Sequence, residues 1–191
     1  KKQFEELQSL LERAMALQTS MVLFEWDDET LAPKGAAEHT ARVIGSLSEQ
    51  YQEILASMRF KELLDACQKA EKENAGVFDE VQSAILREAA EEQERLSCIP
   101  PEEYRAYAEL TARATGIWTR AREKNDFASF APVLKEIISY QKKFAAYRAK
   151  PGQKLYDVML DTYEKGFNME MLDPFFELMK GKIVPLLKES A

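Results

Sequence analysis

The stretch Leu23-Phe24-Glu25-Trp26-Asp27-Asp28-Glu29-Thr30-Leu31-Ala32-Pro33 stands where one helical pattern ends and another begins. Apolar residues before it, at positions 4 to 22, recur at spacings of three and four, as in an amphipathic helix. Pro33 and Gly35 interrupt this pattern, and a second one starts at about residue 36. We therefore expect two helices joined here, with Trp26 buried as an anchor at the end of the first.

The same periodicity continues along the chain, interrupted by short polar links and by Pro or Gly. The expected helices span about 36–70 with a bend near 59–60, 77–96, 101–121, 127–147, 155–164, and 168 or 173 to the last residues. Pro101 suits the first position of a helix, and Gly166 suits the position after a helix end. In the helix over 77–96 we expect Val81, Ile85 and Ala89 to face inward.

No run alternates apolar and polar residues for long enough to predict a strand. The fold class is therefore predicted to be all-α, with about seven helices in a mostly antiparallel bundle. We expect one helical region over 1–191, within which 1–70 is a candidate N-terminal arm or cap and 76–191 a bundle. The aromatic residues on the apolar stripes are expected in the core, namely Tyr104, Tyr107, Trp118, Phe127, Phe130 and Phe144.

The composition limits the classes of partner. The 191 residues are 46% hydrophobic and 31% charged, as in a globular protein, and their net charge of −7 disfavours nucleic acid and anionic membranes. Cys67 and Cys98 are far apart in sequence and are predicted to be thiols in a reducing cytoplasm. There is no signal-peptide pattern and no long apolar run, so we expect a cytoplasmic protein with no membrane partner.

The residues needed for common catalytic sites are absent from this sequence. His39 is its one histidine, whereas a catalytic zinc normally takes three protein ligands, often two or more of them histidines. There is no His-Glu-x-x-His, Cys-x-x-Cys, Gly-x-Ser-x-Gly or phosphate-binding glycine loop. We therefore assign no catalytic, cofactor-binding or metal-binding residue in this segment, and we expect His39 to be a surface residue.

Two acidic groups remain open to two interpretations. Asp157, Asp161 and Glu164 share one helix face, which is either a rim for a cation or substrate amine or, as we favour, a solvated face. The run 27–29 is either part of a site or a set of caps for the next helix, and we favour the caps.

Three blocks of the sequence resemble one family, the thermostable (Taq-type) zinc carboxypeptidases. The first is the Trp26-Asp27-Asp28-Glu29-Thr30 run with Pro33, Gly35 and Arg42, the second is 118–134, and the third is 156–166 with the apolar residues up to Leu186. Their order and spacing agree with the N-terminal portion of the family. This chain has Gln52-Glu53 where relatives often have His-Glu.

The resemblance implies a zincin-like helical metallopeptidase, longer than this chain, that removes C-terminal residues from peptides. Zinc or cobalt would be held by a His-Glu-x-x-His motif and a downstream Glu, all of them beyond Ala191, so the catalytic half is absent here. In that family zinc polarises the scissile carbonyl and lowers the pKa of its bound water. The present segment would then form part of the substrate groove and be inactive by itself. Residues expected to line the groove are Trp26, Asp27, Glu29, Thr30, Asp157 and Asp161.

Two other functions are weighed against this one. The first is a non-catalytic helical interaction or scaffold protein from a shortened gene, and the second is an unrelated helical bundle.

A segment of a larger enzyme would also expose apolar surface meant for the remainder of that enzyme, and such surface tends to drive association. We therefore expect a homodimer or higher oligomer, with a peptide as the substrate of a full-length enzyme.

Overall fold

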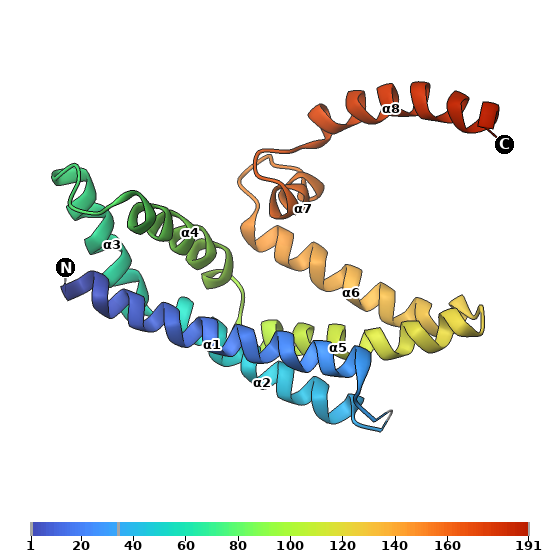
Figure 1. Cartoon of the computed structure of the whole chain (residues 1–191), viewed down its shortest axis with the longest axis horizontal. Coiled ribbons are helices and arrows are strands. Elements are labelled where there is room, and N and C mark those ends of the chain that lie inside the picture. The colour runs from blue at the N-terminus through green and yellow to red at the C-terminus, as the bar shows by residue number, and fades with distance from the viewer. Residues whose placement is uncertain (1, 34, 191) are drawn as a thin grey trace. The chain divides into compact units, whose positions relative to one another are not determined.

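The computed structural model describes residues 2–33 and 35–190, and all regular secondary structure among them is helical (Figure 1). This confirms the all-α prediction. The helices are α1 (Lys2–Thr30), α2 (Ala37–Leu55), α3 (Met58–Glu73), α4 (Glu80–Ser97), α5 (Pro101–Glu123), α6 (Phe127–Arg148), α7 (Leu155–Tyr163) and α8 (Met169–Ser190). Within the described ranges, no helix has the length and apolar character needed to cross a bilayer.

The helix expected over 36–70 is divided into α2 and α3, slightly before the predicted bend. Ser57 is the N-cap of α3, and its side chain accepts a hydrogen bond from the Phe60 N–H at 3.1 Å. Such a cap satisfies one of the free donors at a helix start. Pro101 is the first residue of α5, as predicted, and Gly166 has a φ of +79°, which glycine adopts without strain.

The chain divides into two compact units, Lys1–Ile138 and Ser139–Ala191, with the division inside α6. The grouping into 1–70 and 76–191 remains a prediction.

The first unit is built on α2, which contacts α1, α3, α4 and α5. Apolar side chains from α1 to α4 and the link before α4 form one core, and α1 and α2 run antiparallel along each other (Figure 1). Its buried members are Phe4, Leu7, Ala14, Leu55, Phe60, Leu63, Leu64, Cys67, Phe78, Leu86, Ala89 and Leu96. On α4 the prediction is partly wrong: Ala89 is buried, but Val81 and Ile85 are exposed, and Leu86 and Leu96 take the inward positions.

The most extensive helix pair is α2 with α5. Their close approach is visible at Gly45, where an added Cβ would lie 2.2 Å from Glu109 Cγ. Arg105 holds that glutamate in place, because its Nε lies 3.0 Å from Glu109 Oε1 and its Nη1 lies 2.8 Å from Glu49 Oε2. These ion pairs raise the pKa of Arg105. The pair α2–α5 is therefore joined by a small residue on one helix and an anchored side chain on the other.

The aromatic residues expected in the core differ in burial. Phe144 is buried and Tyr104 packs against the core. Trp118 and Phe127 are exposed, and the Arg122 guanidinium lies 5.2 Å from the centre of the Trp118 ring. The core prediction is therefore wrong for these two residues.

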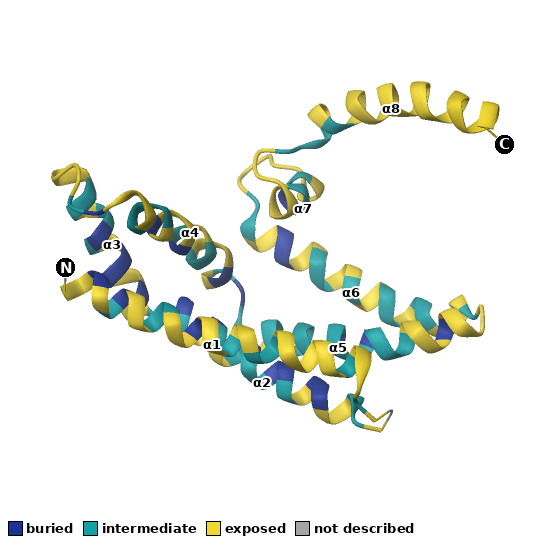
Figure 2. Ribbon diagram, viewed as in Figure 1, coloured by how far each residue is buried: buried dark blue, intermediate teal, exposed yellow. Residues whose placement is uncertain are grey.

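The second unit buries little of its apolar surface. Its buried residues are Phe144, Ala145 and Val158, and α8 has none among its described residues. Figure 2 shows α8 exposed along almost its whole length. Arg148 joins α6 to α7 by donating from Nη1 to Thr162 Oγ1 at 3.2 Å.

Candidate functional site

The end of α1 carries four of the residues expected to line a groove. Trp26, Asp27, Glu29 and Thr30 all lie on the last two turns of the helix and are exposed. The Thr30 hydroxyl donates to the Trp26 carbonyl at 2.6 Å, so Thr30 is turned back onto its own helix. The four side chains therefore form an acidic surface around one indole.

The prediction that Trp26 is buried is wrong, because 60% of this residue is exposed. The apolar positions of α1 pack at its beginning, where Phe4, Leu7 and Ala14 are buried, whereas Met15 and Val22 are exposed. The periodicity predicted the helix correctly but did not show where along the helix its partners end.

The acids at residues 27–29 do not cap the following helix. They belong to α1 itself, whereas α2 begins at Ala37, and its N-cap is Ala36, with no side-chain capping hydrogen bond. The interpretation of these acids as caps is therefore wrong.

Two acids of α7 act as hydrogen-bond acceptors within the second unit. Asp157 Oδ1 accepts from the Met169 N–H at 2.9 Å, and Asp161 Oδ1 accepts from the Gly166 N–H at 2.8 Å. Met169 is the first residue of α8, so Asp157 satisfies one of its free N–H groups. Both carboxylates therefore shape the α7–α8 turn, a role that the sequence analysis did not foresee.

Gln52 is the buried polar residue that sequence reasoning missed. It is completely buried, and its Nε2 donates to the Leu96 carbonyl at 3.1 Å and to the Ile99 carbonyl at 2.6 Å. Its Oε1 has no partner among the described residues. Gln52 thus connects α2 to the end of α4, and the signal in the sequence was a glutamine within an otherwise apolar stripe.

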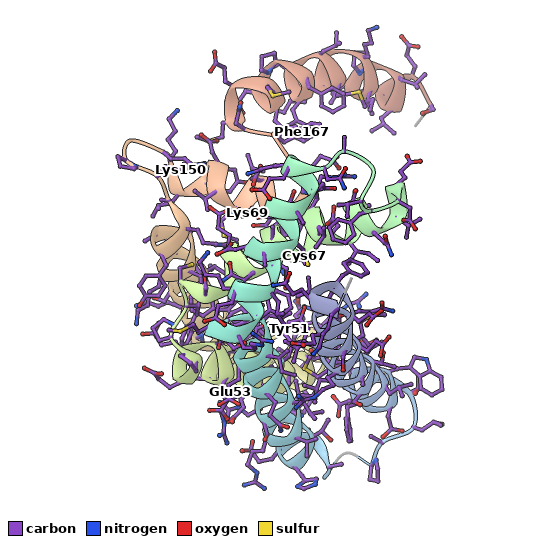
Figure 3. All side chains as sticks on the ribbon, turned by 90° about the vertical axis from the view of Figure 1, so that its left-hand side faces the viewer. Tyr51, Glu53, Cys67, Lys69, Lys150 and Phe167 are labelled. Carbon is purple, nitrogen blue, oxygen red and sulfur yellow. The ribbon has the colours of Figure 1, made fainter. Side chains whose placement is uncertain are left out.

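Beside Gln52, Tyr51 forms a second polar contact between α2 and α4. Its hydroxyl donates to Glu92 Oε1 at 3.1 Å, and Arg95 pairs with the same carboxylate. Burial and the neighbouring Glu92 raise the pKa of Tyr51 well above its ordinary value, and burial also raises the pKa of Tyr104. Tyr51 is half-buried, whereas Glu53 is exposed (both labelled in Figure 3). The Tyr51 phenol therefore keeps its proton, and the Glu92 carboxylate is paired with Arg95. Together they do not form a nucleophile activated by a general base.

The residues present do not suit a metal. Among residues 2–33 and 35–190, no group of three or more His, Cys, Asp or Glu side chains is placed to hold an ion. His39 is exposed, as expected. Cys67 and Cys98 are thiols and form no disulfide, as predicted, and burial raises the pKa of Cys67. An open depression between α3 and α4 is lined by Lys61, Asp65 and Gln93 among others, with no His or Cys.

The chain matches known proteins over almost its entire length. The model of the carboxypeptidase Taq (M32) metallopeptidase family matches residues 6–191. Carboxypeptidase 1 of Bacillus subtilis is 34% identical over 184 residues, covering 96% of this chain and 36% of that protein. Thermostable carboxypeptidase 1 of Pyrococcus furiosus is 31% identical over 175 residues, covering 92% of this chain and 34% of that protein.

Solved structures agree with these matches. The crystal structure of BsuCP superimposes with a TM-score of 0.92 at 32% identity, covering 99% of this chain and 37% of that one. Metallocarboxypeptidase 1 of Trypanosoma cruzi gives a TM-score of 0.77 at 27% identity, covering 98% and 37%. The chain therefore spans about a third of the length of the relatives it matches, as expected for an N-terminal portion. It belongs to the carboxypeptidase Taq (M32) metallopeptidase family.

Proposed function

We propose that this chain is the groove-forming helical segment of a metallocarboxypeptidase that removes C-terminal residues from peptides. The observation that carries the proposal is the family match over residues 6–191. The chain spans about a third of its relatives and has no His-Glu-x-x-His, so our proposal places the residues that perform the chemistry outside this segment.

The segment alone is proposed to be inactive. Its described residues offer no site for a metal, so the zinc or cobalt of a full-length enzyme would be held outside it. Such a metal polarises a carbonyl and activates water. The role left to this segment is to shape the groove and position the peptide.

The exposed end of α1 is the proposed peptide-contacting part. Trp26 offers an apolar surface, and Asp27 and Glu29 beside it are exposed carboxylates. Carboxylates repel the C-terminal carboxylate of a substrate. They are therefore placed toward the N-terminal side of the bound peptide. Asp157 and Asp161 act on the groove indirectly, by shaping the α7–α8 turn.

We also propose a cytoplasmic homodimer with no nucleic-acid or membrane partner. Thiols that are not joined in a disulfide, such as Cys67 and Cys98, suit a reducing compartment. The net charge of −7 opposes binding to polyanions, and the exposed apolar side chains favour self-association.

The test is a chimaera in which this chain replaces the matching segment of Bacillus subtilis carboxypeptidase 1. We expect the zinc-loaded chimaera to cleave C-terminal residues, and the 191-residue chain alone to bind no stoichiometric zinc and to cleave nothing. A folded, zinc-loaded chimaera without turnover would contradict the proposal, as would turnover by the chain alone.

Asp27→Asn in the same chimaera tests the groove assignment. We expect a changed KM for long peptides and little change in kcat on a blocked dipeptide, because the residue contacts only the distant part of a substrate. Glu53→Gln, an exposed acid on α2, is the matched control. A fall in kcat of about a thousandfold on the dipeptide, with folding intact, would place Asp27 at the catalytic centre instead.

A further inference from the structure

The apolar face of α8 has no partner within the second unit. None of its described residues is buried. Most of its large apolar side chains recur at spacings of three and four, which places them on one broad side of the helix. The exposed members are Met171, Phe175, Phe176, Leu178, Met179, Ile183, Leu186 and Leu187. We call this set the α8 apolar face.

The opposite side of α8 is charged and suited to water. Lys180 pairs with Glu177 at 2.7 Å, and both are exposed. Asp173 and Lys188 are exposed on the same side. The helix is thus amphipathic, yet the second unit itself covers neither side. Amphipathic helices of globular proteins normally bury their apolar stripe.

The start of α8 is fixed by hydrogen bonds. Asp157 Oδ1 accepts from the Met169 N–H at 2.9 Å, and Asn168 Oδ1 accepts from the Met171 N–H at 3.0 Å. These contacts hold the first turn of α8 against α7. A helix that is capped at its start and exposed along one apolar side is suited to dock on another surface.

We propose that the α8 apolar face docks onto the remainder of the carboxypeptidase polypeptide, the part that this chain does not match. This inference rests on the proposed function. The chain covers 36% of Bacillus subtilis carboxypeptidase 1 and 37% of the solved BsuCP chain, so relatives contain ample polypeptide to cover the face. The match to BsuCP includes 99% of this chain, so nearly all of α8 lies within the shared fold. Contiguous apolar patches of this kind are rare on soluble monomers and mark interaction sites.

The experiment mixes the 191-residue chain with the unmatched part of Bacillus subtilis carboxypeptidase 1, produced as a separate chain. We expect a one-to-one complex by analytical ultracentrifugation and slowed hydrogen exchange over residues 171–187. Leu178→Asp should weaken the complex by about tenfold or more, because it places an unpaired charge in an apolar contact. Lys188→Asp introduces the same side chain on the charged side and should change affinity by less than about threefold. Circular dichroism checks that both variants fold.

A complex in which α8 exchanges as fast as in the free chain, or in which Leu178→Asp binds as well as Lys188→Asp, overturns the proposal. A homodimer that protects α8 and persists in the presence of the unmatched part shows that a second copy covers the face, and also overturns it.

Where the unmatched part does not fold alone, the single-chain chimaera gives the same exchange measurement, and unprotected α8 there contradicts docking. These experiments measure complex formation and hydrogen exchange, and they do not depend on enzymatic turnover. A protected α8 in an inactive complex therefore supports docking while contradicting the proposed activity.

Discussion

Gln52 joins two helices through one side-chain amide. The sequence showed a glutamine within an apolar stripe, at a position where relatives often have histidine, but its burial and its two carbonyl partners appear in the structure alone. A helical pattern cannot reveal such a contact, because the carbonyls at the end of α4 are distant in sequence. The exposure of Trp26 has the same origin, since it depends on where the neighbours of α1 end.

Gln52→Leu is expected to lower the free energy of unfolding by about 1–3 kcal/mol, because buried carbonyls of α4 and the residues after it lose their donor. Gln50→Leu, at an exposed position two residues earlier, should cost less than about 0.5 kcal/mol. Urea titration of both variants makes the comparison. Equal effects would show that the Gln52 amide contributes nothing beyond its volume.

The raised pKa of Tyr51 leads us to expect a loss of stability at alkaline pH. Its pKa is raised in the folded protein by burial and by Glu92, so the folded state keeps the proton when the unfolded state loses it near the ordinary value of about 10. The stabilisation that comes from keeping the Tyr51 proton is complete below that pH. It is lost as the pH rises toward the pKa of Tyr51 in the folded protein.

Tyr51→Phe has no such proton. Its free energy of unfolding should therefore fall less between about pH 8 and pH 11 than that of the unmodified chain. Urea titrations at the two pH values measure this difference. Parallel losses in both proteins would mean that other groups, such as the lysines or Tyr104, account for the alkaline instability.

At the scale of elements, the sequence predicted most helices because each begins or ends at a local signal. Pro101 at the start of α5 is one such signal, and Gly166 after the end of α7 is another. The inward side of α4 was not predictable in the same way. Val81 and Ile85 fit one helical stripe and Leu86 and Leu96 another, and the helix packs through the second. Contact with α3 and α2, and not periodicity, decides between the two.

Gly45→Ala tests the close approach of α2 and α5. The new Cβ would overlap Glu109, which Arg105 holds, so we expect a loss of about 1–3 kcal/mol despite the better helix propensity of alanine.

Gly116→Ala is the control, because its Cβ would meet only the Arg120 guanidinium at 3.5 Å. This variant should be neutral or more stable by up to about 1 kcal/mol. Thermal melts of both variants, with Glu109→Ala added to relieve the overlap at Gly45, complete the test. Stabilisation by Gly45→Ala alone would show that Glu109 moves aside freely.

For the whole molecule, burial is unequal between the two units. The first contains the continuous core of α1–α4, whereas the second, over residues 139–190, buries Phe144, Ala145 and Val158 alone. Local stability follows buried apolar contacts. Periodicity did not predict this imbalance, because apolar residues recur along α8 at helical spacings as they do along the buried helices.

We expect the isolated chain to unfold in two steps, with the second unit opening first. Hydrogen exchange with increasing urea should show fast exchange in peptides from α7 and α8 and slow exchange in peptides from α2 and α3. A single cooperative transition with equal protection in both units would contradict this order.

The positions of the two tryptophans have an optical consequence. Trp26 and Trp118 are 60% and 44% exposed, so both indoles already face water in the folded chain. Denaturation therefore changes the emission wavelength of this protein little, and fluorescence is a poor gauge of its folding. A molecule that covers the end of α1 removes water from Trp26 and shifts the emission to the blue. The chain thus carries a built-in reporter for occupancy of the surface where we place the peptide, readable without any label.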